Sequence, residues 1–207
     1  MSHELRTPWS AAHGILDLLN HQVTAESNRE LIAQAIRSLN HLNTLVDEVL
    51  DYSKLEAGHL TVAPVKTDLL KTLCDVFRSF EPRALAKGLD YKVTIKPFSN
   101  AFIEIDALRL VQITTNLLSN AVKFTAEGEV GISVILHEKQ LILKVADSGI
   151  GMTDDQLEGI LNPFVQADDT ITRKYGGTGL GLSIVDRLID CMGGVLYIDS
   201  QFGLGTT

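Results

Sequence analysis

The chain has 207 residues, of which 45% are hydrophobic and 21% are charged, and this composition is typical of a folded globular protein. Its formal net charge of -8 argues against nucleic acid or an anionic membrane surface as the main partner. The sequence has no apolar run of about 18 residues that could span a bilayer, so we expect no direct membrane contact from this region.

Two amphipathic helices are predicted at the N-terminal end. Apolar residues recur at alternating steps of four and three from Leu5 to Val23, and again from Ile32 to Val49, which is a heptad pattern. Residues 24–28 between them are polar and predict a turn. Two helices of this size cannot bury both apolar stripes alone. A hairpin that pairs with a second copy as a four-helix bundle is therefore favoured over one packed on its own C-terminal domain.

The motif His3-Glu4-Leu5-Arg6-Thr7-Pro8 lies at the start of the first helix. In the heptad register, His3 and Thr7 fall outside the apolar seam and one helical turn apart, so both are expected to be exposed on one face. A histidine beside a glutamate on a helix is by itself usually a solvated surface pair. Exposure is nevertheless what a phosphoryl acceptor requires.

Gly58, in Glu56-Ala57-Gly58-His59, ends the second helix, and we place a domain boundary here. Residues 1–57 then form a helical hairpin and residues 58–207 a second domain, whose C-terminal end looks truncated. Its patterns predict strands at 60–65, 91–95, 102–105, 130–137, 140–146 and 195–198, and helices at 69–87, 107–124 and 180–192.

This order of elements favours an α/β sandwich with helices on one face of a mixed sheet, so the whole chain is of the α+β class. Residues 148–177 are predicted as a long segment with little regular structure. A loop of this length in a compact domain is usually functional, and its glycines favour a mobile lid.

Asn116, Asn120 and Lys123 lie at positions i, i+4 and i+7 of the predicted helix 107–124, and therefore on one face. Amide oxygens are suitable ligands for Mg²⁺, and a lysine is a suitable partner for phosphates. A polar, solvated helix face explains the same pattern equally well when the block is considered alone.

A second block, Asp147-Ser148-Gly149-Ile150-Gly151, directly follows a predicted buried strand. A carboxylate at a strand end can accept a hydrogen bond from an exocyclic amine such as that of adenine. The two glycines allow a ligand and the backbone to approach closely. A tight Asp-Ser-Gly turn is the alternative for this block by itself.

A third block, Gly176-Gly177-Thr178-Gly179-Leu180-Gly181, precedes a predicted helix. Free N–H groups at a helix N-terminus after flexible glycines favour anion binding, and Arg173 and Lys174 add positive charge. The block matches neither a Walker motif nor a dinucleotide fingerprint.

Together these motifs resemble, in their usual order, those of the catalytic core of the sensor histidine kinases of two-component signalling. His3 to Pro8 resembles the phospho-acceptor box. The four ATP-site boxes are resembled by the three blocks described above, which begin at Asn116, Asp147 and Gly176, and by the segment Asn162 to Gln166 that contains Phe164. The resemblance covers nearly the whole chain. Met1 to Pro8 and Thr172 to Tyr175 are most similar to the hybrid class, in which a receiver domain often follows the kinase core.

The resemblance implies a Bergerat-type ATP-binding domain and an ATP-dependent, autophosphorylating protein histidine kinase with ATP and Mg²⁺ as cofactors. His3 would be the phosphorylated nucleophile and Glu4 its general base, while Thr7 would hold water for dephosphorylation of a partner. Asn120 would bind Mg²⁺. The implied ATP-binding residues are Asn116, Asn120, Lys123, Phe124, Asp147, Gly149, Gly151, Phe164, Arg173, Lys174, Gly177, Thr178, Gly179, Leu180, Gly181 and Thr206.

The implied partners are a second copy of the chain and a response-regulator receiver domain, with phosphatase activity toward that receiver as a further option. The resemblance also implies the cytoplasmic portion of a bacterial signalling protein that is membrane-anchored in full length.

Two alternatives stay open. A non-catalytic or phosphatase-biased homologue keeps the same fold. An ATPase resembling gyrase carries a glutamate one turn before the magnesium asparagine, where this chain has Asn116.

Overall fold

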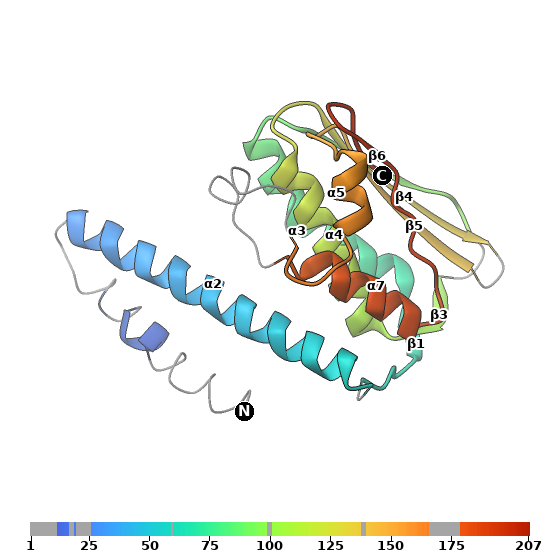
Figure 1. Ribbon diagram of the computed structural model, residues 1–207, viewed down its shortest axis with the longest axis horizontal. Helices are drawn as coiled ribbons and strands as arrows, with labels where there is room; N and C mark the ends of the chain where they lie inside the picture. The colour runs from blue at the N-terminus through green and yellow to red at the C-terminus, as the bar shows by residue number, and fades with distance from the viewer. Residues whose placement is uncertain are drawn as a thin grey trace. The chain divides into compact units, whose positions relative to one another are not determined.

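A computed structural model describes residues 12–16, 19, 26–58, 60–98, 101–137, 140–165 and 179–207 (Figure 1). The chain divides into two compact units, Met1–His59 and Leu60–Thr207. Some sequence-based assignments lie outside the described residues, namely those at His3, Glu4, Thr7, Arg173, Lys174, Gly177 and Thr178.

The first unit contains the long helix α2 (Glu26–Glu56), and residues 12–16 are also helical. The helix stops as the sequence predicts, because Gly58 adopts a φ of 65° and its N–H donates to the Leu55 carbonyl at 3.0 Å. Several apolar side chains of α2 are exposed in the single chain, among them Leu31, Leu42 and Val49. None of the described helices combines the length and apolar character that a membrane span requires.

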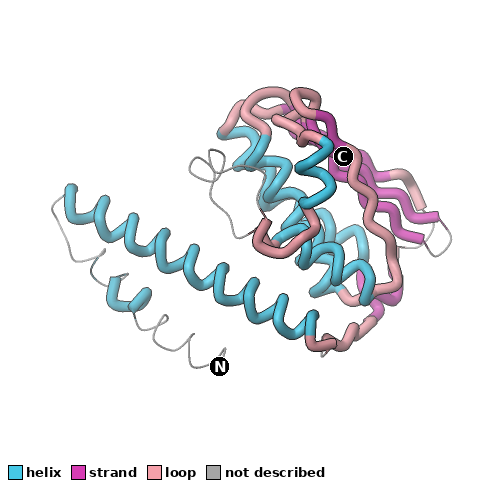
Figure 2. The backbone as a smooth tube through the Cα atoms, viewed as in Figure 1, coloured by secondary structure: helices cyan, strands magenta, loops and turns pink. Residues whose placement is uncertain are grey.

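The second unit is built on a five-stranded mixed sheet with the strand order β2-β4-β5-β7-β6 (Figure 2). Its strands are β2 (Asp90–Ile95), β4 (Glu129–His137), β5 (Gln140–Asp147), β6 (Ser200–Gln201) and β7 (Gly205–Thr206). Strands β2 and β4 are parallel, whereas the other neighbours are antiparallel. A separate antiparallel pair is formed by β1 (Val65–Asp68) and β3 (Phe102–Ile105).

Helices pack on one face of this sheet (Figure 1). They are α3 (Leu69–Ala86), α4 (Ala107–Phe124), α5 (Asp154–Gly159) and α7 (Gly181–Cys191). The core between the layers is made by alternate residues of β4 and by the apolar faces of α3 and α4: Val130, Ile132, Val134, Leu69, Leu73, Phe77 and Leu118 are all buried. The predicted two-layer arrangement of helices on a mixed sheet is therefore confirmed.

Two strand predictions are wrong. The strand expected at 60–65 begins only at Val65, because Pro64 has no N–H and the N–H of Ala63 is bound by the Asp106 carboxylate at 3.0 Å. Residues 194–199 form no strand either. Val195 and Tyr197 have 69% and 84% of their surface exposed, so their apolar character contributes little to the core.

Helix α5 interrupts the region 148–177, which the sequence predicts to lack regular structure. Thr153 caps this helix, and its hydroxyl accepts a hydrogen bond from the N–H of Gln156. The Gln156 side chain in turn accepts one from the N–H of Thr153 at 3.0 Å. This reciprocal capping box explains how a helix of only 6 residues forms at this point.

Candidate functional site

Helix α4 carries the first polar block. Asn116 and Asn120 are both half-buried, which a fully solvated helix face does not explain. The Asn116 amide nitrogen donates to the carbonyl oxygen of Gly181 at 3.4 Å. Asn116 of the first block therefore contacts Gly181, which is both the last residue of the third block and the first residue of α7 (Gly181–Cys191).

The C-terminal end of α4 is bound by Lys87, a residue that sequence reasoning missed. Its Nζ donates to the carbonyl oxygens of Val122 at 2.7 Å, Lys123 at 3.2 Å and Thr125 at 3.3 Å. A cation at this end also complements the negative pole of the helix dipole. No short-range pattern marks Lys87, because its partners lie more than 30 positions away in the sequence.

We expect Lys87→Met to lower the free energy of unfolding by about 1–2 kcal/mol, since it leaves three helix-end carbonyls without their charged donor. Urea unfolding followed by circular dichroism measures this loss. Lys71→Met is the matched control, because Lys71 is exposed like Lys87 but lies in the first turn of α3, whereas Lys87 is the C-cap of that helix. Equal effects of the two substitutions would contradict the proposed role of Lys87.

Asp147 ends β5 and is half-buried. Burial raises the pKa of its carboxyl above the usual value, while hydrogen bonds from the backbone N–H groups of Gly149 and Thr206 act in the opposite direction. The Gly149 bond is 2.8 Å long, and Thr206 is the β7 residue paired with Asp147. The structure thus brings together three of the predicted site residues.

The two glycines after Asp147 lie against other parts of the backbone. A Cβ atom on Gly149 would come within 2.6 Å of the Phe124 carbonyl oxygen, at the end of α4. Gly151 has a φ of 60°, and a Cβ there would overlap the Gln201 carbonyl. Close packing of α4 and the β6–β7 hairpin around this loop therefore requires both glycines. Their contact with a nucleotide stays a prediction.

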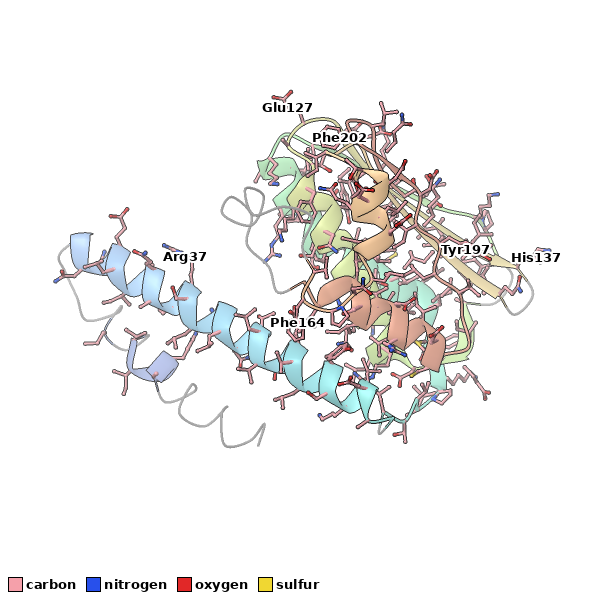
Figure 3. All side chains as sticks on the ribbon, viewed as in Figure 1. Arg37, Glu127, His137, Phe164, Tyr197 and Phe202 are labelled. Atoms are coloured by element: carbon pink, nitrogen blue, oxygen red, sulfur yellow. The ribbon has the colours of Figure 1, made fainter. Side chains whose placement is uncertain are left out.

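Phe164 and Gly179 lie on either side of residues 165–178, and they contact each other through the backbone. The N–H of Phe164 donates to the Gly179 carbonyl at 3.2 Å, and the φ angles of the two residues are 64° and 73°. A Cβ on Gly179 would lie 2.8 Å from the Val165 carbonyl oxygen. The Phe164 side chain is 64% exposed (Figure 3).

The N-terminus of α7 follows immediately. Leu180 precedes the helix and is fully buried, so its side chain belongs to the core and its backbone position is fixed. No side-chain hydrogen bond caps α7 at Leu180. The first-turn N–H groups and the positive pole of the helix dipole therefore provide the features that an anion site needs.

Two protein families match the chain. Residues 105–207 match the "Histidine kinase-, DNA gyrase B-, and HSP90-like ATPase" family, and residues 1–58 match the "His Kinase A (phospho-acceptor) domain". The autoinducer 2 sensor kinase/phosphatase LuxQ of Vibrio cholerae is 38% identical over all of this chain and 24% of its own length. The sensor protein GacS of Pseudomonas syringae is 36% identical over all of this chain and 23% of its own length.

Among solved structures, full-length ShkA in complex with AMPPNP matches 99% of this chain and 42% of its own, with a TM-score of 0.84 and 32% identity. The histidine kinase AdeS of Acinetobacter baumannii has a TM-score of 0.67 over 99% of this chain at 22% identity, which indicates a shared fold. The chain spans about a quarter of the length of the curated relatives named above.

A phospho-acceptor domain followed by an ATPase domain of this type defines the core of a two-component sensor. The chain belongs to the sensor histidine kinases, a family of protein-histidine kinases. The resemblance inferred from the sequence motifs is therefore confirmed, as is the α+β class with a helical region before an ATP-binding domain.

Proposed function

We propose that this chain transfers the γ-phosphoryl group of ATP to His3, and from there to an aspartate of a receiver domain. The family match supports this activity, and one contact carries the proposal within the structure. The Asn116–Gly181 hydrogen bond joins the polar face of α4 to the N-terminus of α7, and this contact supports placing the amide face proposed for Mg²⁺ beside the helix end proposed for the phosphates.

In the proposed pocket, the Asp147 carboxylate accepts a hydrogen bond from the adenine amine. The phosphates lie against the N-terminus of α7, with Asn116 and Lys123 as further contacts. Among the described residues, no group of three or more His, Cys, Asp or Glu side chains could hold a metal ion. The half-buried Asn120 amide fits Mg²⁺, which prefers few protein ligands together with phosphate oxygens and water. When bound, Mg²⁺ would neutralise phosphate charge.

The transfer itself is assigned to the acceptor motif. An imidazole nitrogen of His3 forms a bond to the γ-phosphorus as the bond to the ADP oxygen breaks, and Glu4 takes the proton from the ring. Binding of ATP in one fixed orientation provides the near in-line geometry that this reaction needs.

We also propose that the active form is a homodimer whose hairpins make a four-helix bundle. The exposed apolar residues Leu31, Leu42 and Val49 of α2 support it, because a second hairpin would remove them from water. The relative LuxQ is described as both a sensor kinase and a phosphatase, which supports dephosphorylation of a receiver as a second activity. We further propose that this chain is the cytoplasmic portion of a bacterial signalling protein that is membrane-anchored in full length. We also propose that a receiver domain follows the kinase core, as is often the case in the hybrid class.

Labelled ATP tests the proposed activity. We expect the chain to acquire acid-labile, base-stable phosphate, and we expect His3→Gln to acquire none. Release of free phosphate without labelled protein would instead identify an ATPase. If the protein binds ATP but yields neither product, it is a regulatory homologue and the proposal is wrong.

Two residues of the acceptor motif should separate the two activities. We expect Thr7→Ala to leave autophosphorylation of His3 largely intact but to slow dephosphorylation of a phosphorylated receiver, because Thr7 is assigned to hold the attacking water. Glu4→Gln should reduce autophosphorylation first, since Glu4 acts on the imidazole itself. Rates of both reactions in both variants check this division, which equal losses throughout would contradict.

A further inference from the structure

Three polar side chains lie in one row across neighbouring strands of the five-stranded sheet. Asp147 of β5 is paired with Thr206 of β7, which is paired in turn with Ser200 of β6. Directly paired residues of antiparallel strands project from the same face of a sheet. Asp147 is also paired with Val130, which is fully buried in the core between the sheet and the helices, so the row faces the helical layer. Ser200 is thus a neighbour of the proposed adenine contacts that no sequence motif marks.

The Ser200 hydroxyl has three hydrogen-bond partners. It accepts the N–H of Met152, which lies in the loop after Asp147, at 3.0 Å. Its Oγ also lies 3.0 Å from the carbonyl oxygen of Gly205 and 2.8 Å from Oγ1 of Thr206. A serine hydroxyl has one proton and two lone pairs, so these three partners use its full capacity.

The chemistry of the partners fixes the direction of each bond. The Met152 N–H can only donate and the Gly205 carbonyl can only accept, so the Ser200 proton goes to Gly205. The second lone pair of Ser200 then accepts the proton of the Thr206 hydroxyl. With the reverse direction, the oxygens of Ser200 and Gly205 would face each other without a proton between them. Thr206 therefore offers a ligand the lone pairs of its Oγ1 and not its proton.

This arrangement leaves acceptors on two neighbouring strands at the proposed adenine end of the pocket. One is the Asp147 carboxylate, which the N–H groups of Gly149 and Thr206 hold in place. The other is the hydroxyl oxygen of Thr206. Adenine carries an amine with two N–H donors, whereas guanine has a carbonyl oxygen at the same ring position. An edge that presents acceptors therefore favours adenine and disfavours guanine.

We propose that Ser200 is a positioning residue that holds Thr206 as a hydrogen-bond acceptor and so makes the pocket selective for adenine over guanine nucleotides. The inference rests on the proposed function, because it concerns the same ATP pocket. Without the Ser200 hydroxyl, the hydroxyl of Thr206 is free to rotate and can turn its proton toward the guanine oxygen. Loss of the Ser200 hydroxyl should therefore change which base binds, and not only how tightly a nucleotide binds.

The affinities of the whole chain for ADP and GDP, measured by titration calorimetry, test this role without phosphoryl transfer. We expect Ser200→Ala to lower the preference for ADP over GDP about three- to tenfold, because the released Thr206 hydroxyl can donate to guanine. Ser200→Thr keeps a hydroxyl and should keep the preference within about twofold of wild type. Ser79→Ala is the matched control, because the Ser79 hydroxyl donates to the Val76 carbonyl within α3, and it should leave the preference unchanged.

Thr206→Val separates the proposed role from a general loosening of the loop. This variant lacks the hydroxyl that Ser200 orients, so it should weaken ADP binding without strengthening GDP binding. In this background, Ser200→Ala should change the preference no further. Equal losses for ADP and GDP in Ser200→Ala, or its full effect on the preference in the Thr206→Val background, would show that Ser200 only stabilises the loop and would overturn the proposal.

Hydrogen exchange of the Met152 amide, followed by nuclear magnetic resonance, tests the hydrogen-bond network directly. We expect Ser200→Ala to accelerate this exchange about tenfold or more, and Ser200→Thr to leave it near the wild-type rate. Unchanged exchange in Ser200→Ala would overturn the network. A wild-type chain that binds neither nucleotide would refute the proposed function and this inference with it, whereas ADP binding with an unchanged preference in Ser200→Ala would refute the inference alone.

Discussion

Asp147→Asn is expected to weaken ATP binding by about 10- to 150-fold, because it removes one charge-assisted hydrogen bond worth about 1.5–3 kcal/mol. The carboxylate is half-buried at the end of β5, and Thr206 and Gly149 hold it in place. Titration calorimetry measures the change. Asp199→Asn, a substitution of an exposed aspartate, is the matched control. Unchanged affinity in Asp147→Asn would remove Asp147 from the site.

The raised pKa of Asp147 adds a test by pH. As the pH falls toward this raised pKa, the carboxylate takes up a proton. Protonation removes the negative charge that strengthens the hydrogen bond from the adenine amine, so ATP affinity should fall. Stability moves in the opposite direction, because a group with a raised folded pKa favours the folded state as the pH falls through that pKa toward its ordinary value of 3.8. Asp147→Asn should remove both dependences.

Gly151→Ala is expected to lower the free energy of unfolding by roughly 2–5 kcal/mol. The φ of 60° costs an alanine about 1–2 kcal/mol, and overlap with the Gln201 carbonyl adds about 1–3 kcal/mol. Gly203→Ala is the matched control, because Gly203 also has a positive φ, of 81°, but nothing lies within 4 Å of its Cβ position. It should therefore lose only the backbone contribution.

Urea unfolding of both variants separates the two causes. A larger loss for Gly151→Ala than for Gly203→Ala reports the packing of the Asp147 loop against β6. Equal losses would mean that the loop moves away from β6 without cost, and that the close approach at Gly151 is not required for stability.

Elements with local signals could be predicted from the sequence. The predicted ranges of α4, 107–124, and of β3, 102–105, agree with the structure. For α4, an aspartate at the N-cap and a long amphipathic pattern act together. Helix α5 also had a local signal, the Thr153–Gln156 capping box, but a helix of 6 residues offers too little periodicity to detect.

Secondary-structure predictions were wrong where contacts with residues far away in the sequence determine the local backbone conformation. Apolar residues at 60–65 favour a strand, yet the N–H of Ala63 is bound by Asp106 instead of a neighbouring strand. The same limit applies to the site. Motifs marked Asn116 and Asp147, because these residues carry chemistry in recognisable local patterns. The bonds from Asn116 to Gly181 and from Lys87 to the end of α4 depend on tertiary packing, which no short pattern encodes.

The hydrogen bond between Phe164 and Gly179 has an evolutionary consequence. It holds together the two ends of the stretch 165–178. The conformational entropy lost on closing this stretch is therefore offset by contacts within the folded unit. Doubling the length of a closed stretch adds only about 0.6 kcal/mol. Length changes before Arg173, the first of the predicted ATP contacts in this stretch, should therefore be tolerated better than changes at Phe164 or Gly179, and relatives should differ in length there while they keep the two ends in place.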